Sequence, residues 1–109
     1  MNFKDQIEHE LSKQSWDVVL VDTISEWWED EHWEIQWKHP KGLKLYIQFL
    51  EDIGLTDSRY YVRALKSKKD INILFENPSE IVMLCINKRK LDAKLKAFVS
   101  DIETYRLTP

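Results

Sequence analysis

The stretch Trp33-Glu34-Ile35-Gln36-Trp37-Lys38-His39-Pro40-Lys41-Gly42-Leu43-Lys44-Leu45-Tyr46-Ile47-Gln48-Phe49 decides the fold of this chain. Apolar and polar residues alternate on both sides of its centre, which is the pattern of strands that bury one face. Between the two runs, Pro40 presets φ at the first corner of a turn, and Gly42 allows a positive φ at its exit. The stretch therefore predicts an antiparallel hairpin with Trp33 and Trp37 on its buried face.

Two further elements are predicted before the hairpin. Phe3, Ile7 and Leu11 recur every four residues and predict a helix over residues 3–14 that ends near Ser15. The β-branched run that follows predicts a strand over residues 17–27, with Trp16 in the core at the end of the helix. Because this strand is apolar on both sides, we expect it at a central position in the sheet.

Beyond the hairpin, residues 59–65 predict a fourth strand and residues 66–69 a basic turn. Residues 70–75 fit either a short fifth strand or an extended link. The sequence Asn77-Pro78-Ser79-Glu80 is typical of a helix start, with a capping residue, a first-turn proline and an acid at the capping-box position. Apolar residues keep helical spacing from there to Tyr105, so residues 78–106 are predicted to form one long helix or two shorter ones.

Together these elements predict an α+β fold. It consists of an N-terminal helix, an antiparallel meander of four to five strands, and one long or two shorter C-terminal helices packed on one face of the sheet. The sequence contains no repeat, low-complexity tract or linker, and its length of 109 residues is close to the commonest domain size. We therefore expect a single domain over residues 1–109.

Composition narrows the class of protein. The apolar share of 43% is typical of a globular chain, and no uninterrupted apolar run approaches the roughly 20 residues that span a bilayer. The N-terminal residues are polar and lead into a helical pattern, unlike a signal peptide. Cys85 is the only cysteine, which leaves it without an internal disulfide partner. A cytoplasmic protein is the simplest interpretation.

The net charge of −3 hides an asymmetry along the chain. Residues 1–34 carry ten acids and two lysines, a net charge of −8, whereas residues 35–109 carry fourteen bases and nine acids, a net charge of +5. The acidic part would repel phosphates, and the basic segments 66–69 and 88–90 lack the aromatic-glycine signature of an RNA-binding sheet. We therefore expect no nucleic-acid partner and no membrane partner.

The motifs of catalysis and cofactor binding are missing from the sequence. With glycine only at positions 42 and 54, no phosphate-binding glycine loop is possible, and no HExxH, CxxC or GxSxG motif occurs. Cys85 lies on the apolar stripe of a predicted helix, which indicates a buried and inert thiol. His9 is expected in solvent and His39 in a turn. We expect no catalytic residue, no cofactor and no metal ion.

A tryptophan-rich acidic segment is the best candidate site. Because Trp27 and Trp28 are adjacent, an extended backbone places them on opposite sides, and one of them is expected to be exposed. Carboxylates surround the pair, and His32 follows them. The residues predicted to bind a partner are Glu26, Trp27, Trp28, Glu29, Asp30, Glu31, His32 and Glu34.

Tryptophan anchors many protein interfaces, and acidic clusters steer basic partners. The sequence therefore favours a small, non-catalytic binding protein whose partner is a basic protein, as when an immunity protein or antitoxin inhibits a nuclease toxin. A first alternative is a small α+β enzyme or ligand-binding domain whose pocket between sheet and helices is lined by residues such as His32, Arg59, Tyr60, Tyr61 and Arg63. A second alternative is a self-associating structural subunit with Trp27 or Trp28 at a twofold interface. Both a monomer and a homodimer are compatible with the sequence.

Overall fold

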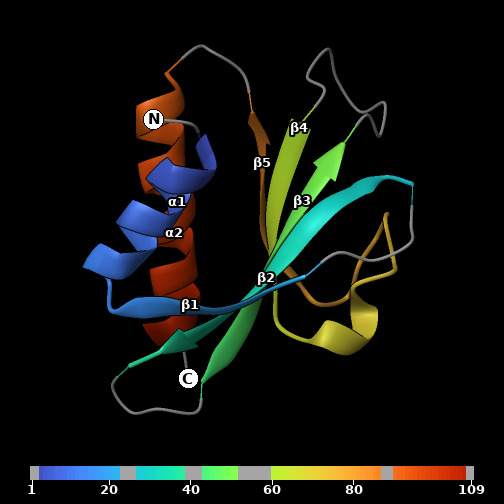
Figure 1. Ribbon diagram of the computed structural model, residues 1–109, viewed down its shortest axis with the longest axis horizontal. Helices are drawn as coiled ribbons and strands as arrows, with labels where there is room; N and C mark the ends of the chain where they lie inside the picture. Colours follow the sequence, from blue (N-terminus) through green and yellow to red (C-terminus); the bar gives the residue numbers. More distant parts are fainter. Residues whose placement is uncertain (1–2, 23–26, 39–42, 52–59, 87–89, 108–109) are drawn as a thin grey trace.

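The computed structural model describes residues 3–22, 27–38, 43–51, 60–86 and 90–107 and confirms the α+β fold (Figure 1). Its elements, in chain order, are α1 (Phe3–Lys13), β1 (Trp16–Asp22), β2 (Glu29–Trp37), β3 (Lys44–Glu51), β4 (Tyr60–Leu65), the short 3-10 helix η1 (Lys68–Asp70), β5 (Glu80–Ile86) and α2 (Leu91–Leu107). The five strands form one antiparallel sheet in the order β1-β2-β3-β4-β5. The sheet is thus a simple meander.

The predicted hairpin is confirmed as β2 and β3. Trp33 lies opposite Ile47 and Ile35 lies opposite Leu45, so the apolar positions of the two strands share one face. Trp33 is buried and its ring meets that of Phe49 edge-on at 4.7 Å. The turn sequence from His39 to Gly42 lies outside the described residues.

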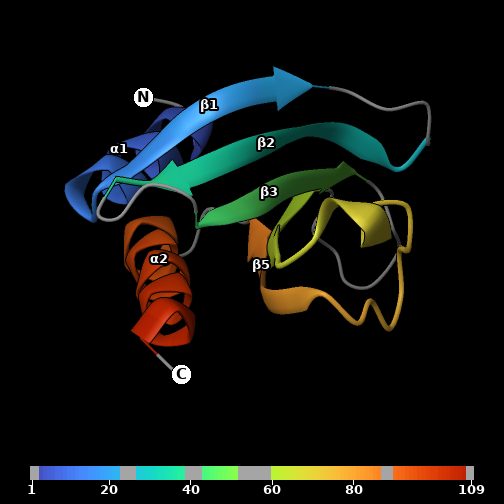
Figure 2. The ribbon, with the colours of Figure 1, turned by 90° about the horizontal axis from the view of Figure 1, so that it is seen from below.

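Both helices cover the same face of the sheet, as predicted (Figures 1 and 2). The apolar stripes of α1 and α2 pack there against the hairpin and β4 to form the main core. Its buried members are Ile7, Leu11, Trp16, Trp33, Ile35, Leu45, Ile47, Phe49, Val62, Ala64, Leu95, Phe98, Val99 and Ile102. Trp16 also donates a hydrogen bond from Nε1 to Glu103 of α2, at 2.7 Å, which ties the start of β1 to the C-terminal helix.

The prediction of a central first strand is wrong. β1 lies at one edge of the sheet, and five of its seven residues are exposed. It ends at Asp22, residues 23–26 lie outside the described residues, and Trp27 belongs to a turn. The apolar run had suggested burial on both faces, but α1 reaches only the start of the strand, and Val19, Leu20 and Val21 are left 46%, 44% and 55% exposed.

The predicted helix start at Asn77 is also wrong. Asn77 does accept a hydrogen bond from the backbone of Ser79, at 2.8 Å, but this caps a turn that leads into β5. The stretch from Ile81 to Ile86 is apolar at every position, and a buried helix and a strand are hard to distinguish in such a run. Here β4 supplies a backbone partner, with Val62 opposite Leu84. The C-terminal region is therefore one strand and one helix.

The segment between β4 and β5 covers part of the second face of the sheet, on the side away from the helices (Figure 1). Residues 70–75 do not form a strand: Asp70 ends η1, residues 71 and 72 form a turn, and residues 73–75 are an irregular link. The predicted basic turn, residues 66–69, contributes the first two residues of η1. Ile71 is buried in this segment. A second, smaller core forms on this face, with Trp28, Leu50 and Tyr61 buried and Leu74, Met83 and Cys85 packed against them.

Candidate functional site

The two adjacent tryptophans differ sharply in exposure. Trp27 is 75% exposed, whereas Trp28 is 5% exposed and packs on Leu50 and Tyr61 in the smaller core. Both belong to the turn that precedes β2. Trp28 also lies 5.8 Å from the guanidinium of Arg63, so the inner indole is anchored by an aromatic–cation contact as well as by apolar packing. The outer indole, Trp27, is thereby held in solvent by its neighbour.

Two of the predicted site carboxylates bind a lysine of α1. Lys4 makes hydrogen-bonded ion pairs with Asp30 and with Glu31, and Glu31 also accepts a hydrogen bond from Trp33 Nε1 at 3.0 Å. Desolvation by itself would lower the pKa of Lys4, but the hydrogen bonds and charges of the two carboxylates outweigh it and raise that pKa. Part of the negative charge of this segment is therefore neutralised within the molecule.

Two other predicted site residues are buried in a polar network. His32 and Glu29 are 2% and 8% exposed, and His32 Nδ1 lies 3.1 Å from Glu29 Oε1. Gln48 donates to the other carboxylate oxygen of Glu29 and accepts from Arg63 Nε at 2.8 Å. The network thus connects β2, β3 and β4 on the second face of the sheet.

Arg63 completes this network and fixes the covering segment. Its two terminal nitrogens donate to the backbone carbonyls of Leu74 and Ile73, at 2.8 and 2.7 Å, and Glu80 lies 3.7 Å away. Burial lowers the pKa of Arg63, and the nearby carboxylates of Glu80 and Glu29 oppose that shift. The arrangement satisfies a buried cation and holds residues 71–74 against the sheet, which is a structural role.

The remaining predicted site residues are Glu34 and Glu26. Glu34 lies on β2 and pairs with Lys44 of β3 at 3.6 Å. Its charge, together with burial, raises the pKa of Tyr46 on the neighbouring strand, burial being the larger cause. Glu26 lies outside the described residues.

An acidic groove that the sequence analysis missed lies between α1 and β1. It has a volume of about 540 Å³ and contains three carboxylates, those of Asp5, Glu8 and Asp17. The same groove is lined by His9, Ser12, Trp16 and Val18. Its acids come from a helix and from the next strand, so no local motif joins them. The predicted position of His9 in solvent is confirmed, because its side chain is exposed.

The groove, the exposed part of β1 and Trp27 follow one another along the chain, starting at the β1 edge of the sheet. The groove lies at the start of β1, Val19, Leu20 and Val21 continue from it, and the β1–β2 connection with Trp27 follows the end of the strand. A strand of seven residues is about 20 Å long. We call this region the β1 surface and define it by Asp5, Glu8, Asp17, Val19, Leu20, Val21 and Trp27.

Three of the residues expected to line an enzyme pocket between sheet and helices lie elsewhere in the structure. The space between the sheet and the helices holds the main core, whereas Tyr61, Arg63 and His32 lie in the smaller core and the polar network of the other face. Tyr60 is exposed and Arg59 lies outside the described residues.

No group of three or more His, Cys, Asp or Glu side chains in the described part of the chain is arranged to hold a metal ion. Neither α1 nor α2 combines the length and the hydropathy that a bilayer crossing requires.

Comparison with known proteins gives no relative: no family model, no curated protein and no solved structure matches this chain.

Proposed function

We propose that this chain is a non-catalytic, intracellular binding protein that captures a basic protein partner through the β1 surface. The observation that carries the proposal is Trp27, which is 75% exposed while Trp16, Trp28 and Trp33 are at most 5% exposed. A large indole held in water is a common anchor of protein interfaces, where it becomes desolvated in a pocket of the partner. Most of the Trp27 side chain makes no packing contact within the fold.

The charge of the β1 surface supports a basic partner. Asp5, Glu8 and Asp17 face one groove, in a third of the chain whose net charge is −8. Complementary charge raises the rate of encounter and selects against acidic partners. The exposed Val19, Leu20 and Val21 supply apolar area along the edge strand, which follows the groove in the chain and precedes Trp27.

Because β1 is an edge strand, an extended segment of the partner could contact it. An edge strand presents backbone N–H and C=O groups that another strand can pair with. An immunity protein or antitoxin that inhibits a nuclease toxin fits these features, because a nuclease must be basic where it binds phosphates.

The experiment is affinity capture from native lysate with the wild-type chain and two matched variants. Trp27→Ser removes the proposed anchor, and Phe75→Ser removes a different aromatic side chain that is 55% exposed in the β4–β5 segment. A basic protein captured by the wild type and by Phe75→Ser but lost with Trp27→Ser supports the proposal. Capture that Trp27→Ser leaves unchanged, or a partner of acidic character, contradicts it.

A further test addresses the mode of inhibition. If the captured partner degrades nucleic acid, stoichiometric addition of this chain should abolish the cleavage, and Trp27→Ser should require a large excess. Charge reversal at Glu29, Asp30 and Glu31 is a poor test, because it would also break the Lys4 pairs and the buried network. Glu8→Lys is the better variant, since Glu8 is exposed in the groove.

A further inference from the structure

β5 forms the opposite edge of the sheet from β1 and has a different character. It is last in the sheet order, and β4 is its strand neighbour among the described residues. Every residue from Ile81 to Ile86 is apolar and half-buried. Natural proteins shield long apolar edges with charges, prolines or bulges, or by pairing them with another strand. β5 has a bulge at Ile81 and a charge at its first residue, Glu80, but the residues from Val82 to Ile86 carry no charge.

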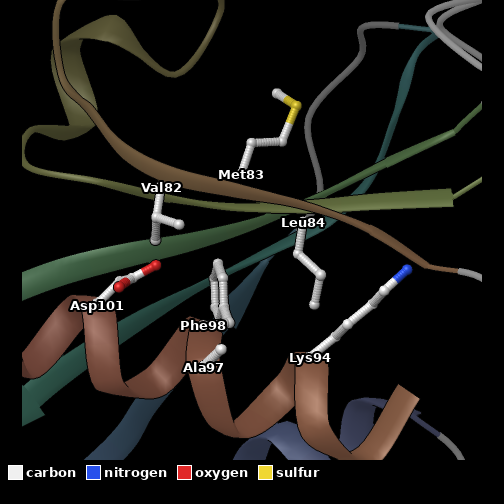
Figure 3. Close-up of a pocket in the computed structure, with 7 residues that line it drawn as sticks. All are labelled: Val82, Met83, Leu84, Lys94, Ala97, Phe98 and Asp101. Atoms are coloured by element: carbon white, nitrogen blue, oxygen red, sulfur yellow. The ribbon is translucent and has the colours of Figure 1, made fainter. Parts of the chain in front are cut away.

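A narrow groove runs between this edge and α2 (Figure 3). Its volume is about 120 Å³, and Val82 and Leu84 point into it from β5 while Met83 points to the other side of the sheet. The helix contributes Ala97 and Phe98 at the middle of the groove. Ala97 is exposed and small, so a second helix can approach α2 closely at this point.

The two ends of this groove carry opposite charges. Lys94 lies beside Leu84, and Asp101 lies beside Val82, with Ala97 between them along the helix (Figure 3). Lys94 and Asp101 are seven residues apart, two helical turns, and so project from the same side of α2. The centre of the groove is thus flanked symmetrically, at the strand by Val82 and Leu84 and at the helix by the two charges.

We propose that β5 is a self-association edge on which the β5 strand of a second copy of this chain pairs antiparallel across a twofold axis near Met83. Antiparallel pairing about that residue puts Val82 opposite Leu84 of the second copy, so that the same faces of the two sheets coincide. The same axis passes near Ala97. It brings Lys94 of each copy to Asp101 of the other, which makes two equivalent ion pairs.

This arrangement joins the two sheets into one and satisfies the backbone groups of both β5 edges. It places the α2 helices of the two copies side by side, and it leaves both β1 surfaces free at the far ends of the joined sheet. A second copy fits the groove better than an extended apolar peptide does, because opposite charges at the two ends are self-complementary only under a twofold axis. The proposal does not depend on the proposed function.

The test measures solution mass over a concentration series, with charge variants. The wild-type chain should shift with rising concentration from 13.1 kDa to twice that mass. Asp101→Lys places two lysines opposite each other and Lys94→Asp places two aspartates opposite each other, so each variant alone should dimerise roughly tenfold more weakly or worse. An equimolar mixture of the two variants should recover the dimer as a heterodimer, because both pairs are then complementary.

Two control variants separate this interface from other contacts. Asp92→Lys reverses a charge at a highly exposed position of the same helix, away from the groove, and should leave dimerisation unchanged. Trp27→Ser should also leave the rise in mass with concentration unchanged. A dimer formed by the tryptophan turn would instead dissociate in this variant. Circular dichroism of each variant checks that the fold is retained.

Three results would overturn the proposal: a chain that stays at 13.1 kDa up to several hundred micromolar, a dimer that ignores the single variants, or a mixture that stays monomeric while each variant is folded. A chain that stays monomeric and binds an apolar peptide along β5 would also overturn it, because the occupant of the edge would then be a peptide and not a second copy.

Discussion

Trp27 and Trp28 are neighbours in sequence, yet we expect their side chains to contribute very different amounts to stability. Trp28 fills the smaller core beside Leu50 and Tyr61, whereas Trp27 is 75% exposed. Trp28→Ala should therefore lower the free energy of unfolding by about 3–5 kcal/mol. Trp27→Ala should change it by less than about 0.5 kcal/mol. Urea unfolding of the two variants measures the difference, and equal losses would show that Trp27 is packed in solution.

Lys4 provides a test of the carboxylates next to this turn. Its pKa is raised above the ordinary value of 10.5 by Asp30 and Glu31 against the effect of desolvation. A raised pKa in the folded state means that the contribution of Lys4 is present below pH 10.5 and is lost as the pH rises through the folded-state pKa. We expect the urea midpoint of the wild type to fall above about pH 10.5, and that of Lys4→Met to fall less.

The pKa of Tyr46 is also raised, by burial and by Glu34, so some alkaline loss of stability should remain in Lys4→Met. Adding Tyr46→Phe should remove a further part of it. Identical alkaline profiles for the wild type and both variants would mean that neither group is linked to folding.

For individual residues, part of the candidate site was predictable from the sequence. The expected difference in exposure between Trp27 and Trp28 is observed, although the pair lies in a turn and not in the extended strand from which it was expected. The polar network was not predictable, because Glu29 and Gln48 are 19 positions apart and Gln48 and Arg63 are 15 apart. Such pairs have no local spacing. Only strand register, which depends on the whole sheet, brings them together.

Among the elements, the hairpin and both helices were predictable from periodicity, whereas β5 was not. An apolar run such as Ile81–Ile86 has no polar positions that could reveal a period of two, and the capping residue Asn77 serves turns as well as helices. The edge position of β1 was missed for a related reason. Its apolar residues suggested burial on both faces, but only the start of the strand lies under a helix.

The strands should differ in backbone protection according to their place in the sheet. β3 has a neighbour on each side and five buried residues, so its amides should exchange with deuterium slowest. β1 has one neighbour and is mostly exposed, so its amides should exchange fastest. Hydrogen exchange read by mass spectrometry on peptides from residues 16–22 and 44–51 measures the contrast. A β1 as well protected as β3 would indicate that another strand already covers its edge.

The same experiment, repeated over a range of protein concentrations, tests the proposed pairing of β5. If two copies pair along β5, peptides from residues 80–86 should become more protected as the protein concentration rises, while those from β1 should not change. Protection of β5 that is independent of concentration would argue against the dimer.

In the whole molecule, the two edges of the sheet are chemically distinct, and the two proposals concern different edges. The β1 edge lies in the acidic third of the chain, beside the groove of Asp5, Glu8 and Asp17. The β5 edge is apolar, with one charge of each sign on the adjacent helix. A dimer formed at β5 would carry one β1 surface at each end, so it could bind two partner molecules without either interface blocking the other.

The charge asymmetry and the exposed indole should act on different steps of partner binding. Net charge acts over distances of about a Debye length, roughly 8 Å at physiological salt, and so governs the encounter. Trp27 acts only after contact, when its surface is desolvated, and so governs dissociation. Raising the salt from about 0.05 to 0.5 M should lower the association rate constant at least tenfold and change the dissociation rate constant little.

Trp27→Ser should do the reverse, raising the dissociation rate constant by roughly tenfold or more with little effect on association. Surface plasmon resonance on the captured partner separates the two constants, and Glu8→Lys should reproduce part of the salt effect on association alone. A salt effect confined to dissociation would show that the acids of the β1 surface form direct contacts and do not steer the partner.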